Sequence, residues 1–309
     1  MTVMLFEDLH TQTMPHKCGF VAIVGLPNTG KSTLVNRYLR EKVTIVSPKP
    51  QTTRTNVTTI LSSKNYQVIF IDTPGLLKPR YKMQEVMASF IISAVKESDV
   101  ILLIIDAAAF KHEHHPAIIS FADELKAKST IIALNKIDVV KKSYLLPLLQ
   151  KTSELFPNVE IVPISALDGD GADELFSIIL KNLPEGPKLY PEDIISNEPE
   201  RFFASEFIRE AVFLTMEKEI PYATAVIIEC FEEKETKVVI QAVILVEKNS
   251  QKPIIIGKNG ATIKEIGTKA RLGIEEFLGR HVFLDLHVKV RKDWRNKDVF
   301  LREAGILKI

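Results

Sequence analysis

The octapeptide GLPNTGKS, residues 25 to 32, has the residue types needed to hold a phosphate chain. It follows the apolar run FVAIVG and opens a stretch with helical spacing, the context in which the pattern G-x-x-x-x-G-K-S/T forms a phosphate-binding loop. Glycines let backbone amides wrap the phosphates, and the following helix N-terminus adds partial positive charge. We expect Lys31 to reach the terminal phosphates and the Ser32 hydroxyl to bind magnesium. The other loop residues of this predicted site are Gly25, Asn28, Thr29, Gly30 and Thr33.

A second motif, DTPG at residues 72 to 75, follows the apolar run QVIFI. Ligands of doubly wound sheets bind at the carboxyl ends of the strands, so this motif belongs beside the phosphate loop. Asp72 is expected to hold magnesium and the Gly75 amide to face the terminal phosphate, with Thr73 and Pro74 completing the motif. The pair of motifs predicts a magnesium-nucleotide site.

A third motif, NKID at residues 135 to 138, indicates which base is bound. The Asp138 carboxylate can accept two hydrogen bonds from the ring and amino nitrogens of guanine, and adenine lacks that amino group. A site built around such bonds strongly rejects the analogue without them, so GTP is favoured over ATP. Asn135 and Lys136 belong to this pocket, and Ser165 and Ala166, after the run VEIVPI, complete it mainly through backbone.

The three motifs and the Ser165-Ala166 pair, in this order on successive strand ends, resemble the P-loop GTPases over residues 18 to 183. The resemblance implies that Thr53, in PQTTRTN, contacts magnesium and senses the terminal phosphate; Thr52 is the neighbouring candidate. Many GTPases place a glutamine after the aspartate-to-glycine motif to orient water, but Leu76 stands there. Hydrolysis is therefore assigned to Lys31, Thr53 and the Gly75 amide, at a slow intrinsic rate of about 10⁻³ to 10⁻⁴ per second.

Asn28 has two readings that stay open at this stage. It matches an asparagine with which some relatives hold a potassium ion beside the phosphates, and asparagine is also favoured in turns for its local backbone hydrogen bonds.

The chain that must position these residues is 309 residues long, a length that favours two domains. Its net charge of +1 excludes no class of binding partner. Apolar runs at 20–25, 67–72, 99–106, 129–135 and 159–165 alternate with expected helices at 32–40, 84–98, 114–127, 142–155 and 172–182. Near-continuous aliphatic runs are typical of strands buried on both faces, so we predict an α/β, doubly wound, mostly parallel sheet. A proline-rich and acidic stretch at 184–200 is the predicted linker, after a leader at 1–17 and the GTPase domain at 18–183.

Beyond the linker, residues 201–309 predict a smaller α+β domain. A helix at 201–219, strands at 223–231 and 237–246, two helices within 252–278 and a strand at 281–290 are expected. GKNG lies between the two later helices, and this order resembles the type II KH domain, in which a GxxG loop clamps about four nucleotides of a single strand. Residues 248 to 297 carry twelve Lys/Arg against five acids, an excess that suits RNA. The expected RNA contacts are Ile256, Gly257, Lys258, Asn259, Gly260 and Lys264, with a floor for bases formed by Ile254, Ile255, Ile256, Ile263 and Ile266.

A GTPase with PQTTR and DTPGL followed by a KH domain that ends in HVFLDLHVKVRKDWR resembles the Era family from Gly19 to about Ile306. The resemblance implies slow GTP hydrolysis and binding of the 3′ end of small-subunit ribosomal RNA in 30S assembly, with GTP/GDP, Mg²⁺ and, through Asn28, K⁺. It also implies peripheral contact to the membrane's inner face. No apolar stretch reaches the length of a membrane span and the first twenty residues have no hydrophobic signal core, so we expect a cytoplasmic protein, and we expect a monomer. Ordering of residues 44–58 by GTP is expected to move the linker and thereby the RNA site.

Alternative readings of the second domain are binding of a protein or a membrane instead of RNA. A metal site at KHEHH, residues 111 to 115, is disfavoured because histidines that cluster at a helix start are usually solvated. Cys18 and Cys230 each lie in an apolar run and are expected to be unpaired core residues. Trp294 is expected to pack the last helix rather than stack on a base.

Overall fold

The computed structural model describes residues 16–47, 49–109 and 128–307. The expected helix at 114–127, the KHEHH stretch and all but the end of the expected leader lie outside these residues. Among the described residues, no helix is both long and apolar enough to span a membrane.

The N-terminal part is built on a six-stranded sheet in the order β2-β3-β1-β4-β5-β6. The predicted strands are present as five parallel neighbours, namely β1 (Lys17–Gly25), β3 (Tyr66–Asp72), β4 (Val100–Asp106), β5 (Ser129–Asn135) and β6 (Glu160–Pro163). The edge strand β2 (Val57–Ser62) was not predicted and runs antiparallel to β3. Since only three residues separate β2 from β3, the two form a hairpin, as antiparallel strands can.

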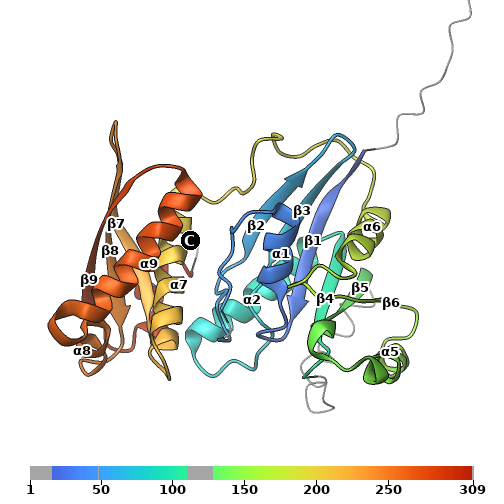
Figure 1. The fold of residues 1–309 in the computed structure, drawn as a ribbon, viewed down its shortest axis with the longest axis horizontal. Coiled ribbons are helices and arrows are strands. Elements are labelled where there is room, and N and C mark those ends of the chain that lie inside the picture. Colours follow the sequence, from blue (N-terminus) through green and yellow to red (C-terminus); the bar gives the residue numbers. More distant parts are fainter. Residues whose placement is uncertain (1–15, 48, 110–127, 308–309) are drawn as a thin grey trace, which may run out of the picture.

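Helices cover both faces of this sheet (Figure 1). They are α1 (Lys31–Leu39), α2 (Lys82–Glu97), α5 (Lys142–Leu155) and α6 (Ala172–Asn182), each within two residues of its predicted bounds. One core joins α1 and α6 to the sheet, and a second core on the other face joins α2 and α5. The doubly wound sheet follows from apolar runs that must be buried on both sides.

The C-terminal part contains a three-stranded sheet in the order β7-β8-β9, with β7 antiparallel and β9 parallel to β8. Its elements follow the predicted order: α7 (Glu200–Thr215), β7 (Ala225–Glu233), β8 (Val238–Val246), α8 (Gln251–Ile256), α9 (Ala261–Leu278), β9 (Val282–Val290) and α10 (Asp298–Glu303). Alternate residues of the strands pack with α7 and α9 in one core. The helices therefore cover one face of the sheet, which is the α+β arrangement expected from the sequence.

The two parts pack against each other, with α7 on the side facing α1 and α2 (Figure 1). A shared apolar cluster joins Met83 and Met87 of α2 to Trp294, which is fully buried and packs with Leu301 of α10, the last helix, as expected. The segment between α6 and α7 is also held, because Ser196 pairs with Thr59 of β2. Both cysteines are free thiols; Cys18 is buried and Cys230 half-buried.

Candidate nucleotide and nucleic-acid sites

The phosphate loop connects β1 to α1 and is built tightly. Gly30 has φ of 95°, and a Cβ there would lie 2.2 Å from Asn135 Nδ2, so only glycine fits. The buried Lys31 Nζ donates to the carbonyls of Gly25 and Leu26 at 3.2 and 3.0 Å. The ammonium is thus held across the loop, at the place where the terminal phosphates are expected.

Three side-chain oxygen groups converge beside this loop. Ser32 Oγ donates to Asp72 Oδ2 at 2.7 Å, and Thr53 Oγ1 lies 3.3 Å from Ser32 Oγ and 3.4 Å from Asp72 Oδ2. Asp72 Oδ1 is buried with no hydrogen-bond partner among the described residues. Hydroxyl and carboxylate oxygens with one acceptor atom to spare are the donor set that Mg²⁺ prefers, so these residues fit the ion. The hydroxyl that joins them belongs to Thr53 rather than Thr52, the alternative that the sequence left open.

Burial shifts the charges of this site. It raises the pKa of Asp72 to about 6, against the opposing effect of Lys31 and of the Ser32 hydrogen bond. It lowers the pKa of Lys31 to about 8, with Asp72 acting in the opposite direction. Desolvation disfavours the ionised form of each residue, and an opposite charge nearby favours it. Bound magnesium would therefore stabilise the Asp72 carboxylate, and bound phosphates would stabilise the Lys31 ammonium.

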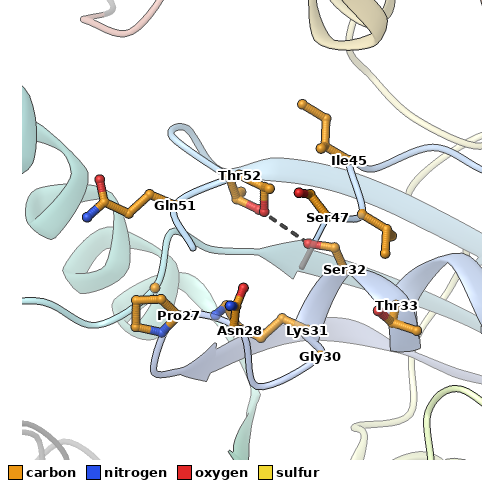
Figure 2. A pocket seen from close by; sticks show the side chains of 13 residues that line it. Pro27, Asn28, Gly30, Lys31, Ser32, Thr33, Ile45, Ser47, Gln51 and Thr52 are labelled. Atoms are coloured by element: carbon orange, nitrogen blue, oxygen red, sulfur yellow. Dashed lines mark hydrogen bonds between the residues drawn. The ribbon is translucent and has the colours of Figure 1, made fainter. Parts of the chain in front are cut away.

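Residues 45–47 and 51–53 lie over the phosphate loop and line a small cavity with it (Figure 2). The dashed line that ends at Ser32 in Figure 2 is its contact with the hydroxyl of Thr53, the residue after the labelled Thr52. Asn28 lines the same cavity with φ of 64°, a turn conformation that asparagine tolerates, so both readings of this residue stay open. Gly75 lies against the loop, since a Cβ there would come within 2.8 Å of Pro27.

Leu76 lies in the apolar core between the sheet and α2 and is 3% exposed. Its side chain therefore points away from the cavity, and its backbone N–H donates to Gly25 O at 3.0 Å. Leu76 thus contributes a backbone hydrogen bond and core packing at the position where many GTPases have a glutamine that orients water.

The NKID motif joins three parts of the predicted base pocket. Asn135 Nδ2 donates to Thr29 O at 2.7 Å, and Asn135 Oδ1 accepts from Ala166 N at 2.8 Å. Lys136 donates to Asp106 at 2.6 Å. Asp138 is exposed and has no hydrogen bond or ion pair with any other residue in the described ranges. Its carboxylate is thus free to accept from a base.

Arg37 is a residue of this pocket that the sequence did not single out. It extends from α1, donates Nε–H to Ala166 O at 2.7 Å and also donates to Leu167 O. A Cβ at Gly169 would lie 2.5 Å from its Nη1, so the loop after β6 wraps around the guanidinium. An arginine on a helical surface gives no sequence signal of such a role, because its usual place is in solvent.

The GKNG turn lies between α8 and α9 and has two dissimilar glycines. A Cβ at Gly257 (φ 73°) would lie 2.1 Å from Thr262 Oγ1, whereas a Cβ at Gly260 (φ 77°) would meet nothing within 4 Å. Lys258, Asn259 and Lys264 are exposed around it, and Ile256 is half-buried. Gly257 is thus required by packing, and Gly260 leaves backbone open to close approach.

The expected floor of isoleucines is partly wrong. Ile255 and Ile266 are 0% exposed in the core with α7, so they cannot meet a base. Ile254 is 52% exposed, and Ile256 and Ile263 are half-buried. The period of a helix brings only some of five isoleucines to one face, and the others fill the core.

The matching family models divide the chain as the fold does. One described as 50S ribosome-binding GTPase matches residues 20–136, and one described as KH domain matches residues 219–295. Among solved structures, Era in complex with MgGDPNP and nucleotides 1506–1542 of 16S ribosomal RNA has a TM-score of 0.91 and 41% identity over 95% of this chain and 100% of that one. A variant of Aquifex aeolicus Era bound to GDP·AlF4⁻ has the same TM-score and identity over 94% of this chain and 100% of that one.

Curated relatives agree over nearly the whole length. GTPase Era of Geobacter metallireducens is 44% identical over 94% of this chain and 98% of the relative. GTPase Era of Carboxydothermus hydrogenoformans is 45% identical over the same shares. With its phosphate loop, its NKID motif and its GKNG turn in place, the chain belongs to the Era family of GTPases, with a P-loop GTPase fold followed by a KH domain.

Proposed function

We propose that this chain is a switch in assembly of the 30S ribosomal subunit, which binds the 3′ end of small-subunit ribosomal RNA and whose state is set by GTP. As a member of its family it hydrolyses GTP to GDP and phosphate, with Mg²⁺ as the cofactor. The observation that carries the RNA proposal is the open backbone at Gly260, beside a GKNG turn in a KH domain. The relative in complex with 16S ribosomal RNA nucleotides supports the choice of RNA.

We assign the nucleotide chemistry to residues of this chain as follows. Lys31 and the loop amides orient the phosphates, and the Gly75 amide stabilises charge on the terminal phosphate as it leaves. Ser32, Thr53 and Asp72 would hold Mg²⁺, which neutralises phosphate charge when bound. Asp138, with Asn135, Lys136, Ser165 and Ala166, would recognise guanine.

Free positive charge supports RNA binding at the GKNG turn. Within the described residues, Lys248, Lys252, Lys258 and Lys264 have no ion pair or side-chain hydrogen bond, and all four are exposed. They flank α8, the turn and the start of α9, where a phosphate backbone that approaches Gly260 would pass. By contrast, Lys269, Arg271 and Arg280 are neutralised by glutamates. The lysines supply charge that is independent of sequence, and the turn supplies contacts to a single strand.

The extents 18–183, 184–200 and 201–309 for the GTPase domain, the linker and the KH domain are part of this proposal. So are a monomeric state and a cytoplasmic location with peripheral contact to the membrane. Co-sedimentation of the chain with anionic vesicles tests the last of these.

Gly260→Asp is the test of the RNA site, because the new side chain enters open space and places negative charge where a phosphate is expected. The matched control is Gly279→Asp, at the other end of α9, where φ is 63° and a Cβ also meets nothing within 4 Å. Affinity is measured at fixed salt for a short RNA matching the small-subunit 3′ end and for a scrambled RNA of equal length, with GDP or a non-hydrolysable GTP analogue.

We expect Gly260→Asp to weaken selective binding at least about tenfold, the size of losing one or two charged contacts, and Gly279→Asp to leave it unchanged. Binding that is equal for both RNAs and insensitive to Gly260→Asp would refute the RNA proposal. It would favour a protein or membrane partner for the KH domain instead.

A further inference from the structure

Arg54 crosses from the GTPase domain into the KH domain. Its guanidinium donates to Thr224 O at 2.5 Å and to the carbonyls of Pro221 and Tyr222 at 3.2 and 3.4 Å. It also lies 5.9 Å from the ring centroid of Trp294. Arg54 is 4% exposed. Burying a guanidinium costs free energy unless its donors are paired. Both terminal nitrogens of Arg54 donate to these carbonyls, whereas its buried Nε has no partner among the described residues. The three carbonyls thus form a receptor for the terminal nitrogens.

The receptor is itself held in shape. Trp294 Nε1–H donates to Ala223 O at 2.9 Å, and Thr224 Oγ1 donates to Pro221 O at 2.9 Å. Within the described residues, each side-chain hydrogen bond of Arg54 goes to a backbone carbonyl of the KH domain, so the position of Arg54 depends on where that backbone lies.

Thr53, whose hydroxyl lies beside Ser32 and Asp72, is the residue directly before Arg54. Consecutive Cα atoms are about 3.8 Å apart, so fixing Arg54 in the KH domain restricts where the Thr53 hydroxyl can lie. One peptide unit therefore connects the predicted magnesium ligands to the second domain.

Two lysines earlier in the segment before Thr53 also contact the KH domain, at α7. Lys42 pairs with Glu210 at 2.6 Å, and Lys49 donates to Phe213 O at 2.5 Å, at the carboxyl end of the helix. Lys42, Lys49 and Arg54 thus each connect the segment that covers the phosphate loop to α7 or to residues 221–224.

We propose that Arg54 is a positioning residue for GTP hydrolysis, which holds Thr53 at the magnesium site through its bonds to residues 221–224 of the KH domain. Hydrolysis then depends on where the KH domain lies, although that domain supplies no group to the phosphates. The proposal rests on the proposed magnesium role of Thr53.

Arg54→Ala in the full chain tests it. Single-turnover GTP hydrolysis is measured as a function of Mg²⁺ concentration, together with GDP affinity and thermal unfolding. We expect the rate at saturating GTP to fall at least about tenfold and the Mg²⁺ needed for half the maximal rate to rise, since charged hydrogen bonds that held Thr53 are lost. GDP affinity should stay within about twofold, because the phosphate loop and the base pocket are untouched.

A second variant acts from the KH side. Trp294→Phe keeps an aromatic ring but removes the bond to Ala223 O, so a loss of about twofold to tenfold in the same two readouts is expected. The control is Lys82→Ala, which removes an exposed ion pair to Asp298 across the same domain boundary, 3.5 Å long, without touching the segment before Thr53. It should hydrolyse GTP as the unmodified chain does.

Normal rates and normal Mg²⁺ dependence in both Arg54→Ala and Trp294→Phe would overturn the proposal. So would an equal loss in Lys82→Ala, since the effect would then belong to the domain boundary as a whole. Unchanged hydrolysis in Thr53→Ala would overturn the magnesium role of Thr53 itself, and the positioning role with it. Loss in Thr53→Ala without loss in Arg54→Ala would overturn the positioning role alone.

Discussion

Replacing Asn135 by alanine should weaken both nucleotide binding and the fold, since this side chain joins the phosphate loop to the base loop. Its amide bridges Thr29 O of the phosphate loop and Ala166 N of the base pocket, at 2.7 and 2.8 Å. Both of those residues are buried, at 2% and 3% exposed. Alanine leaves each backbone group without its partner.

The cost follows from that count of broken bonds. An unsatisfied buried backbone group costs about 1 to 3 kcal/mol, so two of them lower the free energy of unfolding by about 2 to 6 kcal/mol. For a domain of this size, each kcal/mol lowers Tm by about 2 to 4 °C, which gives a fall of at least about 4 °C. GDP affinity should fall at least about tenfold, because the phosphate loop and the base loop lose their common support.

Asn182→Ala is a matched control. Asn182 also makes two side-chain hydrogen bonds, to Ile178 O and from Ser129 Oγ, but at the opposite end of β5 and half-buried. Thermal unfolding and calorimetric titration with GDP are compared for the two variants. The reasoning is refuted if Asn135→Ala binds GDP as tightly as Asn182→Ala does and unfolds at the same temperature.

Three further outcomes are expected. Asp138→Asn should weaken GTP binding at least about tenfold and strengthen binding of xanthosine triphosphate, because an amide donor then faces a ring carbonyl; competition binding measures this, and unchanged selectivity would contradict it. Leu76→Gln should not speed hydrolysis and should destabilise by about 1 to 3 kcal/mol, since an amide enters the core instead of the cavity; faster single-turnover hydrolysis would contradict it. The pKa of Glu275 lies below its ordinary value of 4.5, mainly because the carboxylate accepts from Val282 N, so its stabilising effect is present above 4.5 and is lost as the pH falls. The Tm should therefore fall less steeply between about pH 5 and pH 3 in Glu275→Gln than in Glu276→Gln, the matched change at the exposed neighbour.

The nucleotide site was predictable from sequence because its chemistry lies at the ends of strands. Each apolar run signals a buried strand, and each polar motif that follows must reach the same edge of a parallel sheet. The contacts among Ser32, Thr53 and Asp72 agree with this reasoning, although the choice of Thr53 over Thr52 needed the family resemblance and then the geometry. Their roles as ligands stay predictions.

Other features carried no such signal. VTTILS, which forms β2, is half polar because the strand lies at a sheet edge, so it was not separated from the loop before it. Arg54 sits in a polar loop, and nothing local shows that its partners are carbonyls about 170 residues later. Ile255 and Ile266 were placed at the RNA surface because their type suits both a core and a base platform, and tertiary packing decides between the two.

The packing of α7 shortens the expected path between the nucleotide and the RNA site. Phe203 and Phe207 of α7 pack at tilted angles against the ring of Phe277, near the carboxyl end of α9, while Lys42 and Lys49 contact Glu210 and Phe213 of the same helix. One helix thus contacts both α9 and residues of the segment before Thr53, so a coupling of the two domains through α7 would need no movement of the linker. If GTP changes RNA affinity through α7, then RNA must change GTP-analogue affinity by the same factor, since coupling between two binding equilibria is reciprocal. Unequal factors in the two titrations would mean that a third equilibrium, such as self-association, is coupled to one of them.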